Sequence, residues 1–271
     1  MDPPADGAWN MALDELLLIW TERTGQPIFR LYQWAPAVLS LGYFQRWQDR
    51  FRHPASLSCP MVRRPSGGGA IVHDRELTYG VAVPYCLLPQ GDPSALYGLV
   101  HESLVELFGQ WGLKTHLWEC SCRASAGGRD AHPNGNDDSG QADSSPLIQA
   151  GPEQAPFLCF QRRSRWDVVA DGPDGVEVKL VGSAQRRTRL AVLQHGSILL
   201  GRSPAAPELL GLSELLGRSV RPEELQQAWL AVFQERLGWI WQPDDLTPQQ
   251  HEEADRLVQF KYGANGWTLR R

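Results

Sequence analysis

The stretch Arg63-Arg64-Pro65-Ser66-Gly67-Gly68-Gly69-Ala70-Ile71-Val72-His73-Asp74 decides how the fold of this chain is interpreted. Its three consecutive glycines place no side chain between the backbone and whatever lies against it, and glycine adopts backbone angles that other residues resist. Peptide N–H groups in such a run can converge on an acyl or phosphoryl oxygen. Arg63 and Arg64 add positive charge for an anionic or strongly polar ligand. A glycine-rich hairpin turn is the alternative interpretation.

The same glycines do not form a known nucleotide-binding motif. No Gly-Lys-Ser/Thr follows them, and they do not read Gly-x-Gly-x-x-Gly before a helix. Hydrophobic segments suited to strands, Met61-Val62 and residues 77–83, flank the run on either side. The glycines are therefore expected within a system of strands rather than at the start of a helix.

Length and charge restrict the classes of protein to which this chain can belong. Its 271 residues, 42% of them hydrophobic, are enough to bury the core of one large domain over residues 1–271. The net charge of −5 argues against a general role at nucleic acids or membrane surfaces. No apolar run reaches the roughly 18–20 residues that span a bilayer, and the acidic, proline-bearing N-terminus is unlike a signal peptide. We expect a cytoplasmic protein.

The cysteines indicate reduced thiols rather than a disulfide framework or a metal site. Their number is odd and their spacing is not that of a disulfide-stapled domain, as expected in a cytosol. Cys120-Ser121-Cys122 has no matching His/Cys pair nearby, so no zinc site is predicted. The five cysteines are Cys59, Cys86, Cys120, Cys122 and Cys159.

Hydrophobic periodicity predicts more strands than helices. Apolar residues at positions 9, 12, 13, 16, 17 and 20 fit one helical face, with Asp6 or Asn10 as its cap. Further helices are predicted over residues 94–111, 222–237 and 249–260, and strands over 27–34, 37–42, 77–83, 166–170, 176–181 and 190–200. Because most of the strands are linked as hairpins, we expect an α+β fold with a mixed, largely antiparallel sheet packed with helices.

Residues 121–155 interrupt this pattern. They are dominated by Ser, Gly, Ala, Asp, Asn, Gln and Pro and contain almost no bulky apolar side chains. Such a composition cannot offset the entropy lost on ordering. The segment is therefore predicted to be a flexible low-complexity insertion.

Two side chains, one before the predicted hairpin and one in its second strand, are candidates for catalysis. Lys179 enters the turn Gly182-Ser183-Ala184-Gln185, where its ammonium can approach a carbonyl oxygen or a thiol. Cys159 begins the ordered segment after the insertion, and a thiol accepts an acyl group only as a thiolate beside a cation or base. One hairpin crosses the 20 residues between them and can bring the two together. Taken singly, Lys179 can equally be a solvent-facing strand lysine and Cys159 a small core residue.

Two histidines are further candidates. His195 lies in Gln194-His195-Gly196-Ser197 at the end of a strand, and His73 follows the glycine run. Each can exchange a proton near the same pocket, or can be a hydrogen-bonded structural histidine.

Jointly, these segments resemble the lipoate-protein ligase/octanoyltransferase family, which shares its catalytic fold with biotin protein ligases. The resemblance rests on the motif from Arg64 to Asp74, on Lys179-x-x-Gly182-Ser183-Ala184-Gln185, and on Gln194-His195-Gly196-Ser197-Ile198-Leu199. Asn10-Met11-Ala12-Leu13-Asp14-Glu15 and Lys261-Tyr262-Gly263-Ala264-Asn265-Gly266-Trp267 support it at the two ends. It covers nearly the whole chain apart from residues 121–155.

The resemblance implies an acyl chain held in an apolar tunnel, with the glycine run along the tunnel and Lys179 at the acyl carbonyl. A cation at a developing oxyanion agrees with elementary electrostatics. The substrate-binding residues implied by the motifs are Arg64, Ser66, Gly67, Gly68, Gly69, His73, Gly182, Ser183, Ala184, Gln185, His195 and Gly196.

Within the family, three features favour an octanoyltransferase similar to those of Gram-positive bacteria over an ATP-dependent ligase. Cys159-Phe160, followed by Ser164 and Trp166-Asp167, resembles the cysteine-bearing segment of those transferases. Glu76-Leu77-Thr78-Tyr79 matches the same subgroup, and the chain stops soon after Trp267, without the C-terminal accessory domain of many ligases. Three departures are that Gly69 stands where those transferases often have arginine, that the hairpin before Lys179 is longer, and that Arg163 replaces the subgroup's proline after the cysteine segment.

The resemblance therefore implies a transfer in two steps. Cys159 takes an octanoyl group from acyl carrier protein as a thioester, assisted by Lys179. It passes the group to a lysine of a lipoyl domain, such as that of the glycine cleavage H protein or a 2-oxoacid dehydrogenase E2 subunit. No cofactor is expected. The alternatives are a lipoate ligase that uses ATP and Mg²⁺, and a non-catalytic relative that binds lipoyl domains. A monomer is expected.

Overall fold

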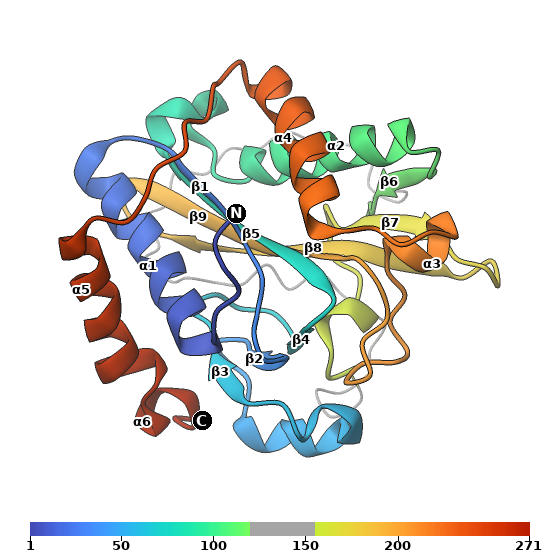
Figure 1. Ribbon diagram of the computed structural model, residues 1–271, viewed down its shortest axis with the longest axis horizontal. Helices are drawn as coiled ribbons and strands as arrows, with labels where there is room; N and C mark the ends of the chain where they lie inside the picture. Colours follow the sequence, from blue (N-terminus) through green and yellow to red (C-terminus); the bar gives the residue numbers. More distant parts are fainter. Residues whose placement is uncertain (120–154) are drawn as a thin grey trace, which may run out of the picture.

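A computed structural model describes residues 1–119 and 155–271 (Figure 1). Its main feature is a six-stranded antiparallel sheet in the order β1-β5-β9-β8-β7-β6. The strands are β1 (Ile28–Tyr32), β5 (Glu76–Pro84), β6 (Thr115–Leu117), β7 (Val168–Asp171), β8 (Glu177–Arg187) and β9 (Ala191–Leu199). The predicted insertion over residues 121–155 lies outside the described residues, apart from Ala155.

A smaller sheet carries the glycine run. It contains β2 (Val38–Leu41) between β3 (Met61–Arg63) and β4 (Ile71–His73). β2 pairs with β3 in parallel and with β4 in antiparallel orientation, and the glycines connect β3 to β4. The prediction that the run lies within a system of strands is therefore confirmed.

Helices cover both faces of the large sheet (Figure 1). On one face, α2 (Ala95–Gln110) and α4 (Pro222–Leu237) pack against alternate residues of β5, including Leu77, Tyr79 and Val81. On the other face, α1 (Gly7–Thr24) packs against Ala82 and Leu193, and α5 (Pro248–Leu257) packs against α1. Alternation along a strand sends successive side chains into the two layers. The remaining helices are α3 (Leu212–Leu216), α6 (Asn265–Thr268), a π-helical turn over Val258–Tyr262, and short 3-10 turns.

Local sequence signals explain where the long helices begin and end. The Asp6 carboxylate accepts the Trp9 N–H at 2.8 Å and caps α1, one of the two caps predicted, and Gly25 ends the helix with a φ of 68°. Pro222 and Pro248 occupy the first helical positions of α4 and α5, where a missing N–H costs nothing. None of the helices in the described ranges is both long and apolar enough to cross a bilayer.

The predicted fold class is confirmed, with one correction. The strands form two sheets rather than one, because β2, β3 and β4 pair among themselves. The ordered segment at Cys159 is a 3-10 turn over Cys159–Gln161, preceded by a single bridge between Ala70 and Leu158. The short strand β6 was not predicted from the sequence.

Candidate active site

The glycine run holds the cysteine segment directly against it. The Cys159 N–H donates to the Ala70 carbonyl at 2.7 Å, and the Ala70 N–H donates to the Phe157 carbonyl at 3.1 Å. A Cβ at Gly69 would lie 3.1 Å from both N and Cα of Cys159, tighter than an ordinary contact. Gly68 adopts a φ of 92°, which L side chains rarely tolerate. Glycine is therefore needed here so that the backbone can turn and Cys159 can approach it closely.

Cys159 and Lys179 meet, although the hairpin between them is long. Lys179 Nζ lies 3.7 Å from Cys159 Sγ and 3.5 Å from the Cys159 carbonyl oxygen. A shift in register between Val168 and Val169 marks a bulge where β7 pairs with β8. The prediction that one hairpin folds the two residues together is confirmed.

A buried carboxylate holds the ammonium of Lys179 in place. Asp167 Oδ2 lies 2.7 Å from Lys179 Nζ, and the two side chains are 4% and 2% exposed. The other contact of this carboxylate is the Ser164 N–H, 2.7 Å away. Burial alone would lower the pKa of Lys179, but the negative charges of Cys159 and Asp167 outweigh burial, and this pKa lies above its ordinary value. Lys179 is therefore a cation at neutral pH, next to the thiol.

A narrow cavity of about 90 Å³ opens beside these groups, between the α1 face of the large sheet and the small sheet. Cys159, Lys179 and Asp167 line it together with apolar groups of Met11 and Ile71. Nine of the predicted substrate-binding residues border it: Arg64, Gly67, Gly68, His73, Gly182, Ser183, Ala184, His195 and Gly196.

Gly182 provides the space that the Lys179 ammonium occupies. A methyl group at Gly182 would overlap Lys179 Cε and lie 2.9 Å from Nζ. We expect Gly182→Ala to displace this flexible side chain from both Cys159 and Asp167, slowing a reaction of the Cys159 thiol that the cation assists by about 10²-fold, the effect of a lost electrostatic contact. Gly109→Ala in α2 is the matched control, because outside its chain neighbours and its own helix backbone no atom lies within 4 Å of its Cβ position. Stopped-flow measurement of the reaction at Cys159 together with thermal unfolding would test this, and an unchanged rate in Gly182→Ala would contradict it.

The three predicted residues that do not border the cavity have identifiable positions. Ser66 lies behind it and pairs with His195 Nε2, while Gly69 packs against Cys159. Gln185 belongs to the opposite face of β8, where its amide donates to the Pro93 carbonyl at 2.8 Å and to Gln194 at 3.0 Å. Alternation along the strand separates Gln185 from its neighbours Gly182 and Ala184.

The two histidines form buried hydrogen-bond networks. His195 Nδ1 lies 2.7 Å from Asp14 Oδ2, so Nδ1 carries the proton and Nε2 accepts from the Ser66 hydroxyl. His73 Nδ1 likewise lies 2.6 Å from Glu76 Oε1, with its Nε2 2.7 Å from Ser40 Oγ. Each ring is thereby fixed in one orientation at the wall of the cavity.

The two arginines before the glycine run donate hydrogen bonds to backbone carbonyls. Arg63 is fully buried, and its guanidinium donates to the carbonyls of Gly42, Gln45 and Thr268 at 2.7–3.1 Å. Arg64 donates to the carbonyls of Gly67 and Gly69, both at 2.7 Å, and burial lowers its pKa to about 10. The prediction that Arg63 supplies charge to a ligand is wrong, because its N–H groups are used to fix the chain around the glycines.

Several buried polar residues of the site were not predicted from the sequence. Asp167 was named only as part of the segment that resembles the family. A carboxylate at the start of an apolar strand requires a cation nearby, and this requirement is the sequence signal that could have identified Asp167. Asp14 is enclosed in α1 and lies 3.3 Å from Arg30 Nη1, and no periodicity identifies it. Tyr79 and His101 both contact the Ser183 hydroxyl from the α2 side of the sheet. In the described ranges, no cluster of three His, Cys, Asp or Glu side chains could hold a metal ion.

His101 makes the fold sensitive to acid. Burial lowers its pKa to about 4, and its Nδ1 faces the Trp166 carbonyl while Nε2 lies 2.6 Å from Ser183 Oγ. Because the unfolded chain binds this proton below about pH 6.5 and the folded chain only near pH 4, stability falls as pH decreases across this window, by up to about 3 kcal/mol. Urea unfolding should show that His101→Gln reduces this loss and that His116→Gln, at an exposed site, does not. Equal pH slopes for all three proteins would refute the assignment.

Residues 6–210 match the protein family described as the lipoyl protein ligase A/B catalytic domain. The chain belongs to this family. The matched residues contain the glycine run, Cys159, Asp167, Lys179 and His195, so the family predicted from the motifs is confirmed.

Curated relatives and solved structures agree with this assignment. Octanoyltransferase LipM of Kyrpidia tusciae is 35% identical over 291 residues, covering 97% of this chain and 95% of the relative. Octanoyltransferase LipM of Symbiobacterium thermophilum is 32% identical over 98% of this chain and 95% of its own length. The solved structure of a bi-partite lipoate protein ligase from Thermoplasma acidophilum superposes with a TM-score of 0.69 at 18% identity, covering 99% of this chain and 94% of that chain. At this identity the similarity shows a shared fold alone.

Proposed function

We propose that this chain is an octanoyltransferase of protein lipoylation that carries the octanoyl group on Cys159. The observation that carries the proposal is the thiol of Cys159, 3.7 Å from a buried ammonium that a carboxylate holds in place, both in the wall of a narrow cavity. A ligase that activates a free acid with ATP does not need a thiol at this position, whereas a transferase that works through a thioester does. The similarity to proteins named octanoyltransferase LipM supports the same activity.

In the first step, the Cys159 thiolate attacks the carbonyl carbon of octanoyl-acyl carrier protein. A new carbon–sulfur bond forms, the bond to the carrier's sulfur breaks, and the carrier leaves as a thiolate that takes up a proton. The Lys179 ammonium stabilises the attacking thiolate and the negative oxygen of the tetrahedral intermediate. Backbone N–H groups near Gly182 are further donors in this proposal.

In the second step, the uncharged amine of a lipoyl-domain lysine attacks the octanoyl-Cys159 carbonyl. An amide forms, Cys159 leaves as a thiolate, and the proton lost by the amine passes to solvent. The acceptor is a lipoyl domain such as that of the glycine cleavage H protein or a 2-oxoacid dehydrogenase E2 subunit. Neither step requires ATP or Mg²⁺, because the donor thioester is already activated.

The test uses the full chain and octanoyl-acyl carrier protein without ATP. Intact mass spectrometry should show one octanoyl adduct that hydroxylamine removes and that a lipoyl domain discharges. Absence of an adduct, together with lipoylation that requires ATP and free lipoate, would establish the ligase instead. Binding of a lipoyl domain without either reaction would identify the non-catalytic relative.

A further inference from the structure

A cluster of cations and aromatic rings, here called the arginine rim, lies at Tyr43, Arg186, Arg270 and Arg271. The Arg270 guanidinium carbon lies 3.7 Å from the centroid of the Tyr43 ring, and the Arg186 guanidinium carbon lies 5.9 Å from the same centroid. Arg271 lies over the exposed ring of Phe44 at 5.3 Å. Segments far apart in the sequence therefore gather three guanidinium groups at one place.

The arginine rim adjoins the glycine run and the strand that carries Lys179. The Tyr43 N–H donates to the Ser66 carbonyl at 2.8 Å, next to the glycines. Ala184 borders the active-site cavity, and Arg186 projects from the same face of β8 two residues further on, about 7 Å along the strand. The exposed rim is therefore continuous with the wall of the catalytic cavity.

Within residues 1–119 and 155–271, no Asp or Glu side chain neutralises the arginine rim. None of its three arginines forms an ion pair of 4.0 Å or less with such a carboxylate, whereas the neighbouring Lys261 pairs with Glu15 at 2.6 Å. Hydrogen bonding from Arg270 and the charges of Arg270, Arg186 and Arg271 lower the pKa of the Tyr43 phenol. Nε of Arg270 is buried and has no hydrogen-bond partner in the described residues. In a chain of net charge −5, this concentration of unpaired cations fits an anionic partner.

We propose that the arginine rim docks the acyl donor, an acidic carrier protein whose phosphodiester-linked arm passes from the rim to Cys159. This inference rests on the proposed function. Arginine suits a phosphodiester because its planar fork donates two parallel hydrogen bonds. The acceptor, in contrast, presents a lysine ammonium, which three guanidinium groups repel. The charges of the arginine rim therefore favour the donor over the acceptor.

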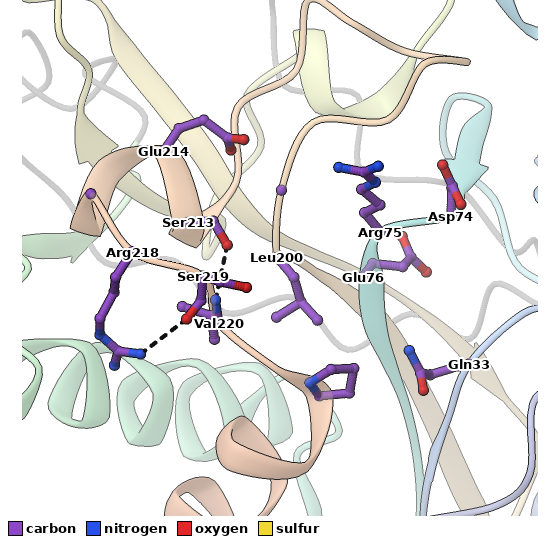
Figure 2. Close-up of a pocket in the computed structure, with 13 residues that line it drawn as sticks. Gln33, Asp74, Arg75, Glu76, Leu200, Ser213, Glu214, Arg218, Ser219 and Val220 are labelled. Atoms are coloured by element: carbon purple, nitrogen blue, oxygen red, sulfur yellow. Dashed lines mark hydrogen bonds between the residues drawn. The ribbon is translucent and has the colours of Figure 1, made fainter.

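An arginine on a second surface, where acidic and basic side chains are mixed, provides the control. A cavity of about 590 Å³ lies between the start of β5 and the segment after α3, and its lining includes Arg75 and Glu76 from the first and Arg218 from the second (Figure 2). Arg75 is exposed and has no carboxylate within 4.0 Å among the described residues. It thus resembles Arg186 in exposure and charge but lies outside the arginine rim.

The test compares two donors of the same octanoyl group, octanoyl-carrier protein and octanoyl-pantetheine, which has neither the protein nor the phosphate. The rate of octanoyl-Cys159 formation is measured by intact mass. In Arg186→Glu, the ratio of the carrier-protein rate to the pantetheine rate should fall about tenfold or more, the size expected for lost electrostatic steering. In Arg75→Glu the ratio should stay unchanged. Added salt should reduce the wild-type ratio toward that of Arg186→Glu.

Other outcomes would overturn the proposal. An unchanged ratio in Arg186→Glu, or a fall in Arg75→Glu instead, places the donor elsewhere. A loss confined to discharge of preformed octanoyl-enzyme by a lipoyl domain assigns the arginine rim to the acceptor. Calorimetric binding of the phosphopantetheinylated carrier to Cys159→Ala, with and without Arg186→Glu, requires no chemistry. Weaker binding after Arg186→Glu supports docking even if Cys159 is never acylated, in which case only the proposed function fails.

Discussion

Cys159→Ala is expected to abolish the octanoyl adduct and to reduce transfer to a lipoyl domain by at least ~10⁴-fold, the scale of losing a catalytic nucleophile. In the proposed mechanism this thiol forms the thioester, and no other cysteine of the described residues borders the cavity beside the Lys179 ammonium. The assay is transfer of octanoyl from carrier protein to a lipoyl domain, with intact mass spectrometry of the enzyme.

Two other thiols serve as controls for this substitution. Cys59 is buried in the small-sheet core, where burial raises its pKa, and Cys86 is exposed. Neither borders the active-site cavity. Cys59→Ala and Cys86→Ala should therefore keep the adduct, and an adduct that survives Cys159→Ala would place the nucleophile elsewhere.

The fold could be predicted from the sequence wherever hydrophobic periodicity agrees with the Gly, Pro and Asp residues that begin or end an element. Helix α4 begins and ends as predicted, because Pro222 opens it and a left-handed Gly238 follows its last residue. The β7–β8 hairpin follows from two apolar strands around Asp171-Gly172-Pro173-Asp174-Gly175. The division into two sheets could not be predicted, because pairing between β2, β3 and β4 depends on contacts distant in sequence.

The candidate active site was predicted as a set of residues with a single contact among them, between Cys159 and Lys179. Motifs identified Cys159 and Lys179, and the structure brings them together. Motifs did not indicate that the Arg63 guanidinium donates to backbone carbonyls, or that Gln185 lies on the face of the sheet opposite to the cavity. Both facts depend on the orientation of a side chain. The arginine rim likewise joins residues 43, 186 and 270, a proximity that composition and spacing do not reveal. The roles of the predicted substrate-binding residues stay predictions.

Lys179→Met is expected to lower octanoyl-thioester formation by about 10²–10³-fold, the effect of removing one preorganised group at a developing oxyanion. The same substitution leaves the Asp167 carboxylate buried without its cation. Breaking a buried pair from one side costs about 3–5 kcal/mol, so the free energy of unfolding should fall as well. Activity and stability therefore change together in this single variant, and a second variant is needed to separate them.

The double variant Lys179→Met/Asp167→Asn separates catalysis from stability. An asparagine at position 167 carries no charge and can still accept the Ser164 N–H, so urea unfolding should recover much of the lost stability. Acylation should remain about 10²–10³-fold slow, because no cation lies beside the Cys159 sulfur. Recovery of the acylation rate along with stability would mean that Lys179 only supports the fold. A slow but stable double variant would identify its ammonium as the group that stabilises the reacting charges.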